Sequence, residues 1–362
     1  MPTPTAPWRP PVRADLALLE GYHSAQVHVD VRLNTNESPF PPPPGFAQRL
    51  ADVVAAAEWH RYPDRAAGEL RAAIAELHDV GPDNVFVANG SNEVLQTLLL
   101  TFAGPGRRVA TFEPTYALHA HIAHISGATV VEGERSEDFT LELDEVDRVL
   151  AERPSVVFLC SPNNPTGRIE EPATVEAVAA RARAVDALLV VDEAYGQFAP
   201  WSAQTLLAED RAIAITRTYS KTWSMAAARL GYLLGPTWLV AELDKVVLPY
   251  HLDVVKQAAG VLALDYTADM NERVSVLVEE RGRLSAALAD LGVTVWPSAA
   301  NFVLFRPDGH DADAVWQGLV DRSVLVRNCA SWPRLAGCLR VTIGTPAEND
   351  RFIAALAEVL RP

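Results

Sequence analysis

Residues 156–195 read VVFLCSPNNPTGRIEEPATVEAVAARARAVDALLVVDEAY. This stretch contains two short apolar runs, Val156–Cys160 and Leu188–Asp192, which are joined by an Ala-, Glu- and Arg-rich segment of helical composition. Strands that are buried on both faces are continuously apolar, and a helix between two of them makes a parallel crossover. The stretch therefore predicts a strand–helix–strand unit of a parallel α/β sheet.

The same alternation of short apolar runs and longer helical segments extends from about residue 60 to residue 250. Each further run is bounded by Gly, Pro, Asn or Ser, as strands commonly are. The additional strand candidates are Val85–Ala88, Arg108–Phe112, Thr129–Glu132, Ala212–Thr216 and Gly231–Leu234. Together these runs predict an α/β protein with a mostly parallel seven-stranded sheet.

The pattern changes after Pro249. A long helical region from Val254 to about Leu291 is followed by two strand candidates, Asn301–Phe305 and Cys338–Ile343, and a closing helix begins at Pro346. We therefore expect a large domain over residues 45–250 and a smaller α+β domain over residues 251–362.

The first 44 residues are Pro-rich at both ends. Between the Pro-rich segments lie a helix-like stretch, Asp15–Leu19, and a strand-like stretch, Val27–Leu33. Because Pro-rich segments do not build a packed core, we expect residues 1–44 to form an extended arm that packs with the small domain or with a partner subunit.

Composition excludes several classes of function. The formal net charge of −15 argues against nucleic acid and anionic membrane as partners. No apolar run is long enough to span a membrane, and the first residues lack the pattern of a signal peptide. Cys160, Cys329 and Cys338 are an odd set without metal-ligand spacing. We expect a cytoplasmic protein without a metal site.

Unusual residues follow the predicted strands, at the edge where an open parallel sheet binds its ligands. A Gly turn at a helix start, as in the first of these segments, can offer backbone N–H groups to a phosphate. The segments, in chain order, are Asn89-Gly90-Ser91-Asn92-Glu93, Glu113-Pro114-Thr115-Tyr116, Ser161-Pro162-Asn163-Asn164-Pro165-Thr166-Gly167, Asp192-Glu193-Ala194-Tyr195, and Thr218-Tyr219-Ser220-Lys221 with Arg229.

Each segment also has an ordinary structural interpretation. Asn164-Pro165-Thr166-Gly167 could be a type I turn, Asp192 a helix cap, Tyr116 a rim aromatic and Ser220-Lys221 a solvated loop. All of them lie at strand ends, and this conjunction favours one shared site.

Pyridoxal phosphate unites the segments, because it needs an amine for its aldehyde, a carboxylate for its ring nitrogen and an anion site for its phosphate. The chain has three lysines. Lys245 and Lys256 lie in helical stretches beside acidic residues, which leaves Lys221 as the candidate amine.

Candidate residues also exist for the other groups of the cofactor. Asp192 is the candidate carboxylate. Tyr116 can stack on the ring, and Asn164 and Tyr195 can bind its 3-oxygen. The candidate phosphate site comprises Gly90, Ser91, Asn92, Thr218, Ser220 and Arg229.

These segments resemble the class I/II aminotransferases of fold type I, and within that family the histidinol-phosphate aminotransferase branch. The resemblance runs over nearly the whole chain, from Arg32 to Thr345. The segments that resemble the branch are Arg61-Tyr62-Pro63-Asp64, Asn36-Glu37, Leu248-Pro249-Tyr250-His251-Leu252 and Val326-Arg327-Asn328. It implies the PLP-dependent transferase fold, transamination between L-histidinol phosphate and 2-oxoglutarate, and a homodimer.

The resemblance also implies roles that the residues alone do not reveal. Tyr62 is implied to reach the cofactor phosphate of the other subunit, and Arg340 to bind the substrate carboxylate or phosphate. Arg327 and Tyr22 are implied to lie near the distal phosphate of the substrate, and Asn36 to contact the substrate. Planar guanidinium groups suit such anions, although Arg327 and Arg340 could also be ordinary surface arginines.

Two positions depart from the family pattern. Ala227 stands where the family usually has Gly, two residues before the phosphate-binding Arg, and Ser38 stands where Asn is common. An aromatic amino-acid aminotransferase and a threonine-phosphate decarboxylase-type lyase remain alternatives, since both resemble this sequence. A ligand-sensing domain of a transcription regulator would need a DNA-binding module, for which the Pro-rich arm is too short.

Overall fold

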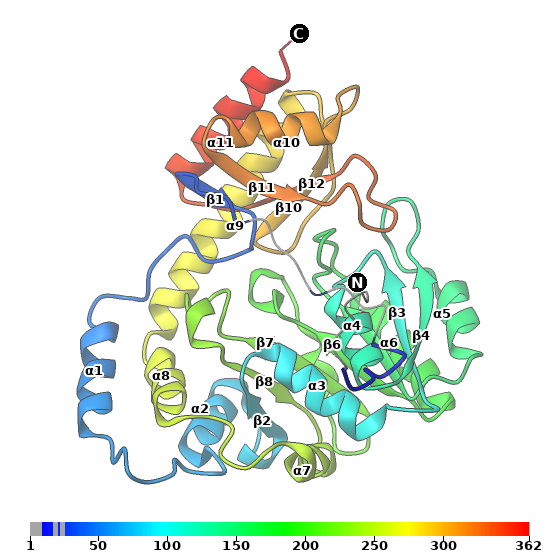
Figure 1. Ribbon diagram of the computed structural model, residues 1–362, viewed down its shortest axis with the longest axis vertical. Helices are drawn as coiled ribbons and strands as arrows, with labels where there is room; N and C mark the ends of the chain where they lie inside the picture. The colour runs from blue at the N-terminus through cyan, green and yellow to red at the C-terminus, as the bar shows by residue number, and fades with distance from the viewer. Residues whose placement is uncertain (1–8, 17–20, 22–25, 362) are drawn as a thin grey trace, which may run out of the picture.

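The computed structural model describes residues 9–16, 21 and 26–361. Figure 1 shows two parts, each built around its own sheet. A seven-stranded sheet forms the lower part and a five-stranded sheet the upper part. No helix in these residues is long and apolar enough to cross a membrane.

The large sheet has the strand order β2-β8-β7-β6-β5-β3-β4. Its strands are β2 (Val85–Ala88), β3 (Arg108–Glu113), β4 (Thr129–Glu134), β5 (Val156–Cys160), β6 (Leu188–Asp192), β7 (Ile213–Thr218) and β8 (Gly231–Leu234). Strands β3 to β7 pair in parallel, whereas β8 is antiparallel to both β2 and β7. The prediction of a mostly parallel seven-stranded sheet is therefore confirmed.

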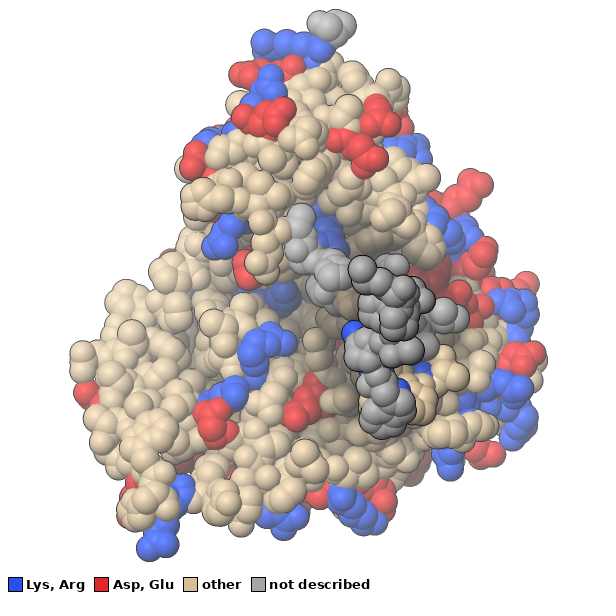
Figure 2. All heavy atoms as spheres, viewed as in Figure 1, with Lys and Arg blue, Asp and Glu red and all other residues tan. Residues whose placement is uncertain are grey.

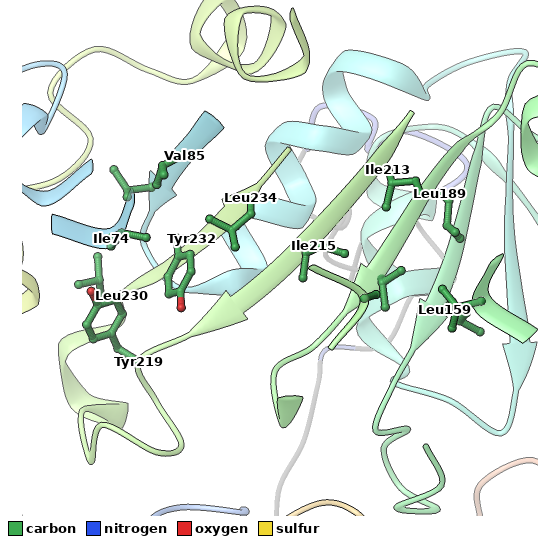
Figure 3. Close-up of a cluster of buried hydrophobic side chains, with 14 of the residues drawn as sticks. Ile74, Val85, Leu159, Leu189, Ile213, Ile215, Tyr219, Leu230, Tyr232 and Leu234 are labelled. Carbon is green, nitrogen blue, oxygen red and sulfur yellow. The ribbon is translucent and has the colours of Figure 1, made fainter. Parts of the chain in front are cut away.

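Helices cover both faces of this sheet. Successive side chains of a strand point to opposite faces, so Leu189 and Val191 belong to one core and Leu188 and Val190 to the other. Figure 3 shows the first core, in which Ile74 lies against strand residues. The helices on that face are α2 (Gly68–His78), α5 (Leu143–Leu150), α6 (Pro172–Ala184) and α8 (Val254–Leu264); those on the other are α3 (Ser91–Phe102), α4 (Leu118–Ile125) and α7 (Thr237–Val246).

The small sheet has the order β1-β11-β12-β10-β9. Its strands are β1 (Val31–Leu33), β9 (Thr294–Val295), β10 (Phe302–Arg306), β11 (Val324–Asn328) and β12 (Leu339–Thr342), and the helices beside it are α9 (Thr267–Asp290), α10 (Ala312–Val320) and α11 (Pro346–Val359). Strand β1 lies within the range expected for the arm, but it pairs with β11 and places Val31 and Leu33 in the core. Helix α1 (Phe46–Ala56) follows the arm.

Some elements differ from the expectations. The helical region from Val254 is two helices, because the amides of Asp265 and Tyr266 bond three residues back and the Thr267 hydroxyl bonds the Leu264 carbonyl. Such tighter bonds end a helix. Strand β11 was not predicted, since only three apolar residues precede Arg327. Asp15 lies in a turn, and most of the predicted helix Asp15–Leu19 falls outside the described residues.

Candidate active site

A cavity of about 180 Å³ lies where the carboxyl ends of the parallel strands face the small sheet. The structure brings together there most of the side chains that the sequence predicted: Asn36, Ser91, Asn92, Tyr116, Asn164, Asp192, Tyr195, Thr218, Ser220, Lys221, Arg229 and Arg340. Figure 2 shows basic and acidic side chains intermixed over one face, with basic atoms also where the two parts meet.

Lys221 is half-buried at the wall of this cavity, and its Nζ donates to the carbonyl of Thr35 at 3.1 Å. Burial, together with the positive charges of Arg340 and Arg229, lowers the pKa of its ammonium group to about 7, against a smaller opposing effect of Glu37. A large fraction of this amine is therefore unprotonated at neutral pH.

Asp192 is the last residue of β6 and is buried. Its Oδ2 lies 2.9 Å from Nε2 of His119, and its Oδ1 accepts the amide of Ala194 at 3.1 Å. The imidazole of His119 stacks on Phe158 with 4.4 Å between the ring centroids. The carboxylate thus has a fixed orientation at the cavity wall.

Backbone geometry shapes the end of the cavity that lies beside the start of α3 and Arg229. Gly90 has φ +80°, and a Cβ there would lie 2.8 Å from Nη2 of Arg229. A Cβ on Gly231 would lie 2.3 Å from the backbone nitrogen of Ser91. Only glycines allow the start of α3, the start of β8 and the Arg229 guanidinium to come this close. Gly90 itself does not line the cavity.

The first turn of α3 and Arg229 make this end suited to an anion. The first amides of a helix have no intrahelical acceptor and carry the positive end of the helix dipole. Ser91 begins α3, and the Arg229 Nη1 donates to Oγ of Ser220 at 3.3 Å. Arg229 keeps its place on the cavity wall although Ala227 replaces the usual glycine.

Asn36 orients the phenol of Tyr195. Its Nδ2 donates to the Tyr195 hydroxyl at 2.9 Å, while its Oδ1 accepts from the hydroxyl of Thr342. Because the Tyr195 oxygen accepts this bond, its own hydrogen remains to be donated elsewhere. Burial raises the pKa of Tyr195 to about 12, so the phenol is protonated at neutral pH.

Arg340 is buried and links the two sheets. Its Nη1 donates to Oδ1 of Asn164 and its Nη2 to the carbonyl of Asn34. Its Nε is buried without a hydrogen-bond partner among the described residues. A buried donor without a partner is costly, so Arg340 has capacity for one further acceptor.

The remaining predicted residues lie elsewhere. Arg327 faces Arg340 across β11 and β12 and contacts the ring of Trp332, which lines the cavity. Tyr62 is 79% exposed, stacks on Tyr250 and does not reach the cavity of its own chain. Tyr22 lies outside the described residues.

Sequence reasoning missed His119, Gly231 and Trp332. His119 is one of three histidines in α4, and only the fold shows which of them faces Asp192. Gly231 begins a predicted strand, where its close approach to α3 leaves no sequence signal. Trp332 lies in the loop between β11 and β12, and β11 itself was not predicted.

The family model of the class I and II aminotransferases matches residues 29–356. The chain belongs to the class I and II aminotransferases. It is 45% identical to the histidinol-phosphate aminotransferase of Streptomyces avermitilis over 96% of both chains. It is 44% identical to the enzyme of that name from Frankia casuarinae, over 98% of this chain and 93% of the relative.

A solved structure agrees with this assignment. The histidinol-phosphate aminotransferase of Sinorhizobium meliloti, determined in complex with pyridoxal-5'-phosphate, superposes with a TM-score of 0.83 at 27% identity, covering 92% of this chain and 91% of that one. The predicted PLP-dependent transferase fold of type I, the predicted enzyme class and the predicted cofactor are therefore confirmed at the level of the family.

The described residues fit pyridoxal phosphate. The cavity combines an amine of lowered pKa, a fixed buried carboxylate and a helix start suited to an anion, which two glycines keep open. These are the three groups that the cofactor requires.

Proposed function

We propose that this aminotransferase transfers the amino group of L-histidinol phosphate to 2-oxoglutarate, giving imidazole-acetol phosphate and L-glutamate in cytoplasmic histidine biosynthesis. The observation that carries the proposal is the pair Arg327 and Arg340, which face each other across β11 and β12 beside the cavity. Two guanidinium groups on one face of a strand pair repel each other unless an anion lies near them. The names of the relatives support this choice of substrate.

Pyridoxal phosphate, when bound, supplies a ring that withdraws electrons from the reacting carbon of the substrate. Lys221 would hold its aldehyde, and Asp192 would keep its ring nitrogen protonated. The Tyr195 hydroxyl and Asn164 would bind its 3-oxygen, and Tyr116 would stack on its ring. Gly90, Ser91, Asn92, Thr218, Ser220 and Arg229 would form the phosphate site.

Lys221 would also serve as the base. Its free amine would remove the proton from Cα of the substrate. A base works best when its pKa lies near the working pH, and the Lys221 pKa of about 7 meets this condition.

Arg340, Arg327, Asn36 and Tyr22 would bind the substrate. Arg340 lines the cavity together with Lys221, and its Nε has no hydrogen-bond partner in the part of the chain that the structure describes, which suits a carboxylate of 2-oxoglutarate or an oxygen of the phosphate ester. Arg327, one strand away, would bind the distal phosphate. Planar guanidinium groups recognise both anions through paired hydrogen bonds.

The active form would be a homodimer. Tyr62 is 79% exposed and Leu248 75% exposed, and Tyr62 stacks on Tyr250, so large apolar side chains lie together on the surface. Tyr62 would reach the cofactor phosphate of the other subunit. Mixing inactive Lys221→Ala and Tyr62→Ala protomers should then restore activity, because one site of each mixed dimer has neither defect.

The direct test is product analysis with purified holoenzyme. L-Histidinol phosphate and 2-oxoglutarate should give L-glutamate in a 1:1 ratio with the oxo product, and Lys221→Ala should give none. Preferential turnover of L-phenylalanine would assign the enzyme to aromatic amino acids. Carbon dioxide release from a phosphorylated amino acid without consumption of 2-oxoglutarate would indicate a lyase.

A further inference from the structure

Arg327 and Arg340 are directly opposite in the antiparallel pair of β11 and β12. Directly opposite residues place their Cβ atoms about 4.5–5.5 Å apart on the same face of the sheet. Each guanidinium lies over an aromatic ring. Arg340 lies 5.0 Å from the ring centroid of Phe302, and Arg327 lies 5.2 Å from that of Trp332.

The two aromatic rings differ in their position. Phe302 is fully buried in the core of the small sheet, so it is a fixed support beneath Arg340. Trp332 is half-buried and lines the cavity, while its ring also contacts Arg327. Trp332 therefore contacts both the cavity and an arginine that does not itself line it.

The loop that carries Trp332 is firmly held. The amide of Cys329 donates to the carbonyl of Cys338, and the amide of Trp332 donates to the carbonyl of Cys329 at 2.9 Å. Trp332 packs against the buried cluster that includes Leu304 and Leu335. A ring anchored in this way has little freedom to swing away from Arg327.

The same loop is tied to the large sheet. Arg334 forms an ion pair with Glu134, the last residue of β4. The loop therefore bridges the small sheet, which carries both arginines, and the large sheet, which carries the predicted cofactor site. This exposed ion pair is a contact of the Trp332 loop with the part of the molecule that carries Lys221 and Asp192.

We propose that Trp332 is a positioning residue for substrate specificity: its ring holds the Arg327 guanidinium toward the cavity, so that the enzyme selects substrates with a distal phosphate group. The inference rests on the proposed function, which assigns the distal phosphate to Arg327. A flat ring beside the guanidinium restricts its rotation, while the N–H groups at the guanidinium edge keep the geometry that binds an anion. Trp332 thus acts through Arg327 rather than on the reacting atoms.

The test compares Trp332→Leu, which removes the ring face, with Trp332→Phe, which keeps one. A cation–π contact of this kind corresponds to a roughly 2- to 30-fold change in binding. Trp332→Leu should raise the KM for L-histidinol phosphate and the dissociation constant of inorganic phosphate from the holoenzyme by that factor, with kcat little changed. Trp332→Phe should bring both constants most of the way back to the wild-type values. In Trp332→Leu, the KM for 2-oxoglutarate should change less than the KM for L-histidinol phosphate. Trp238→Leu, at a partly exposed tryptophan of α7 that does not line the cavity, is the matched control and should leave these constants unchanged.

A double-mutant cycle separates this role from a structural one. In an Arg327→Ala background, Trp332→Leu should no longer weaken phosphate binding, because the residue through which it acts is gone. An equal effect of Trp332→Leu with and without Arg327, or unchanged phosphate binding in Trp332→Leu, would overturn the inference. The dissociation constant of inorganic phosphate can be measured without turnover of a substrate. If the wild-type enzyme did not use L-histidinol phosphate, the proposed function would fail, while the phosphate cycle would still decide the role of Trp332.

Discussion

Nε2 of His119 lies 2.9 Å from Oδ2 of Asp192, and both side chains are buried. Stacking on Phe158 fixes the imidazole, and the imidazole fixes the carboxylate. The residue predicted to hold the cofactor nitrogen is therefore positioned by a histidine from α4 that no sequence feature singled out.

Replacing His119 with Leu should lower kcat/KM by roughly 10- to 100-fold, since hydrogen bonds to charged groups contribute about 1.5–3 kcal/mol. His119→Asn, which keeps an N–H donor, should recover part of the loss. Steady-state kinetics measure the effect, and thermal unfolding monitors the fold. Equal kinetics for the leucine variant and the wild type would show that Asp192 needs no such partner.

The lowered pKa of Lys221 predicts how the apoenzyme reacts with pyridoxal phosphate. Only the unprotonated amine attacks the aldehyde, so the rate should rise with pH around a midpoint of about 7 rather than near the usual lysine value of 10.5. Stopped-flow absorbance at the cofactor band measures this rate. Lys221→Met should not show the shift of this band that follows reaction with the amine, whereas Lys245→Met, at an exposed helix position, should behave as the wild type.

Gly231→Ala should disrupt the end of the cavity that is proposed to bind the cofactor phosphate. Its Cβ would lie 2.3 Å from the Ser91 nitrogen and 2.5 Å from the Gly90 carbonyl carbon, both of which are backbone atoms that must shift. Overpacking of this kind destabilises a protein by about 1–3 kcal/mol, and the affinity for pyridoxal phosphate should fall with it. Chemical unfolding and cofactor titration provide the two readouts.

Gly282→Ala is the control for this substitution, because a Cβ there meets nothing within 4 Å in α9. It should stabilise the protein by about 0.4–1 kcal/mol and leave the cofactor affinity unchanged. Normal cofactor affinity in Gly231→Ala would show that the start of β8 does not shape the site.

The lowered pKa of His78 predicts that the folded protein loses stability in acid. Its ring nitrogens lie 2.8 Å from the Gln204 side chain and 2.8 Å from the Tyr232 hydroxyl, and burial lowers its pKa from 6.5 to about 4. The unfolded chain binds the proton on His78 more tightly than the folded protein does. The free energy of unfolding therefore falls as the pH is lowered from about 6.5 to about 4. The loss is at most about 3 kcal/mol. The free energy of unfolding of His78→Gln should vary less than that of the wild type over this range, and parallel pH profiles would contradict the assignment.

Strands of the large sheet were predictable because burial on both faces leaves continuously apolar runs such as Val156–Cys160. The small sheet was harder to predict. Strand β11 carries Arg327 and Asn328 beside the site, so its apolar run is short, and the strand-like stretch that contains β1 was assigned to the arm rather than to this sheet. Polar residues placed beside the site thus shorten the apolar run by which β11 could have been predicted.

The site was predictable where its residues follow strands, since Asp192 and Lys221 lie close to the ends of β6 and β7. Residues that act through a neighbour gave no such signal. His119 depends on how α4 packs, and Trp332 depends on the register of β11 and β12, which places Arg327 opposite Arg340. These relationships join distant parts of the chain and exist only in the folded protein.

The most direct test of the substrate is a single turnover of the cofactor-loaded enzyme, followed by absorbance, with L-histidinol phosphate and in parallel with L-phenylalanine. We expect rapid conversion to the pyridoxamine phosphate form with L-histidinol phosphate, slow conversion with L-phenylalanine, and a preference that falls when Arg327 is replaced by Ala. Conversion by L-phenylalanine with equal or greater efficiency would contradict the proposed substrate and assign the cavity to aromatic amino acids.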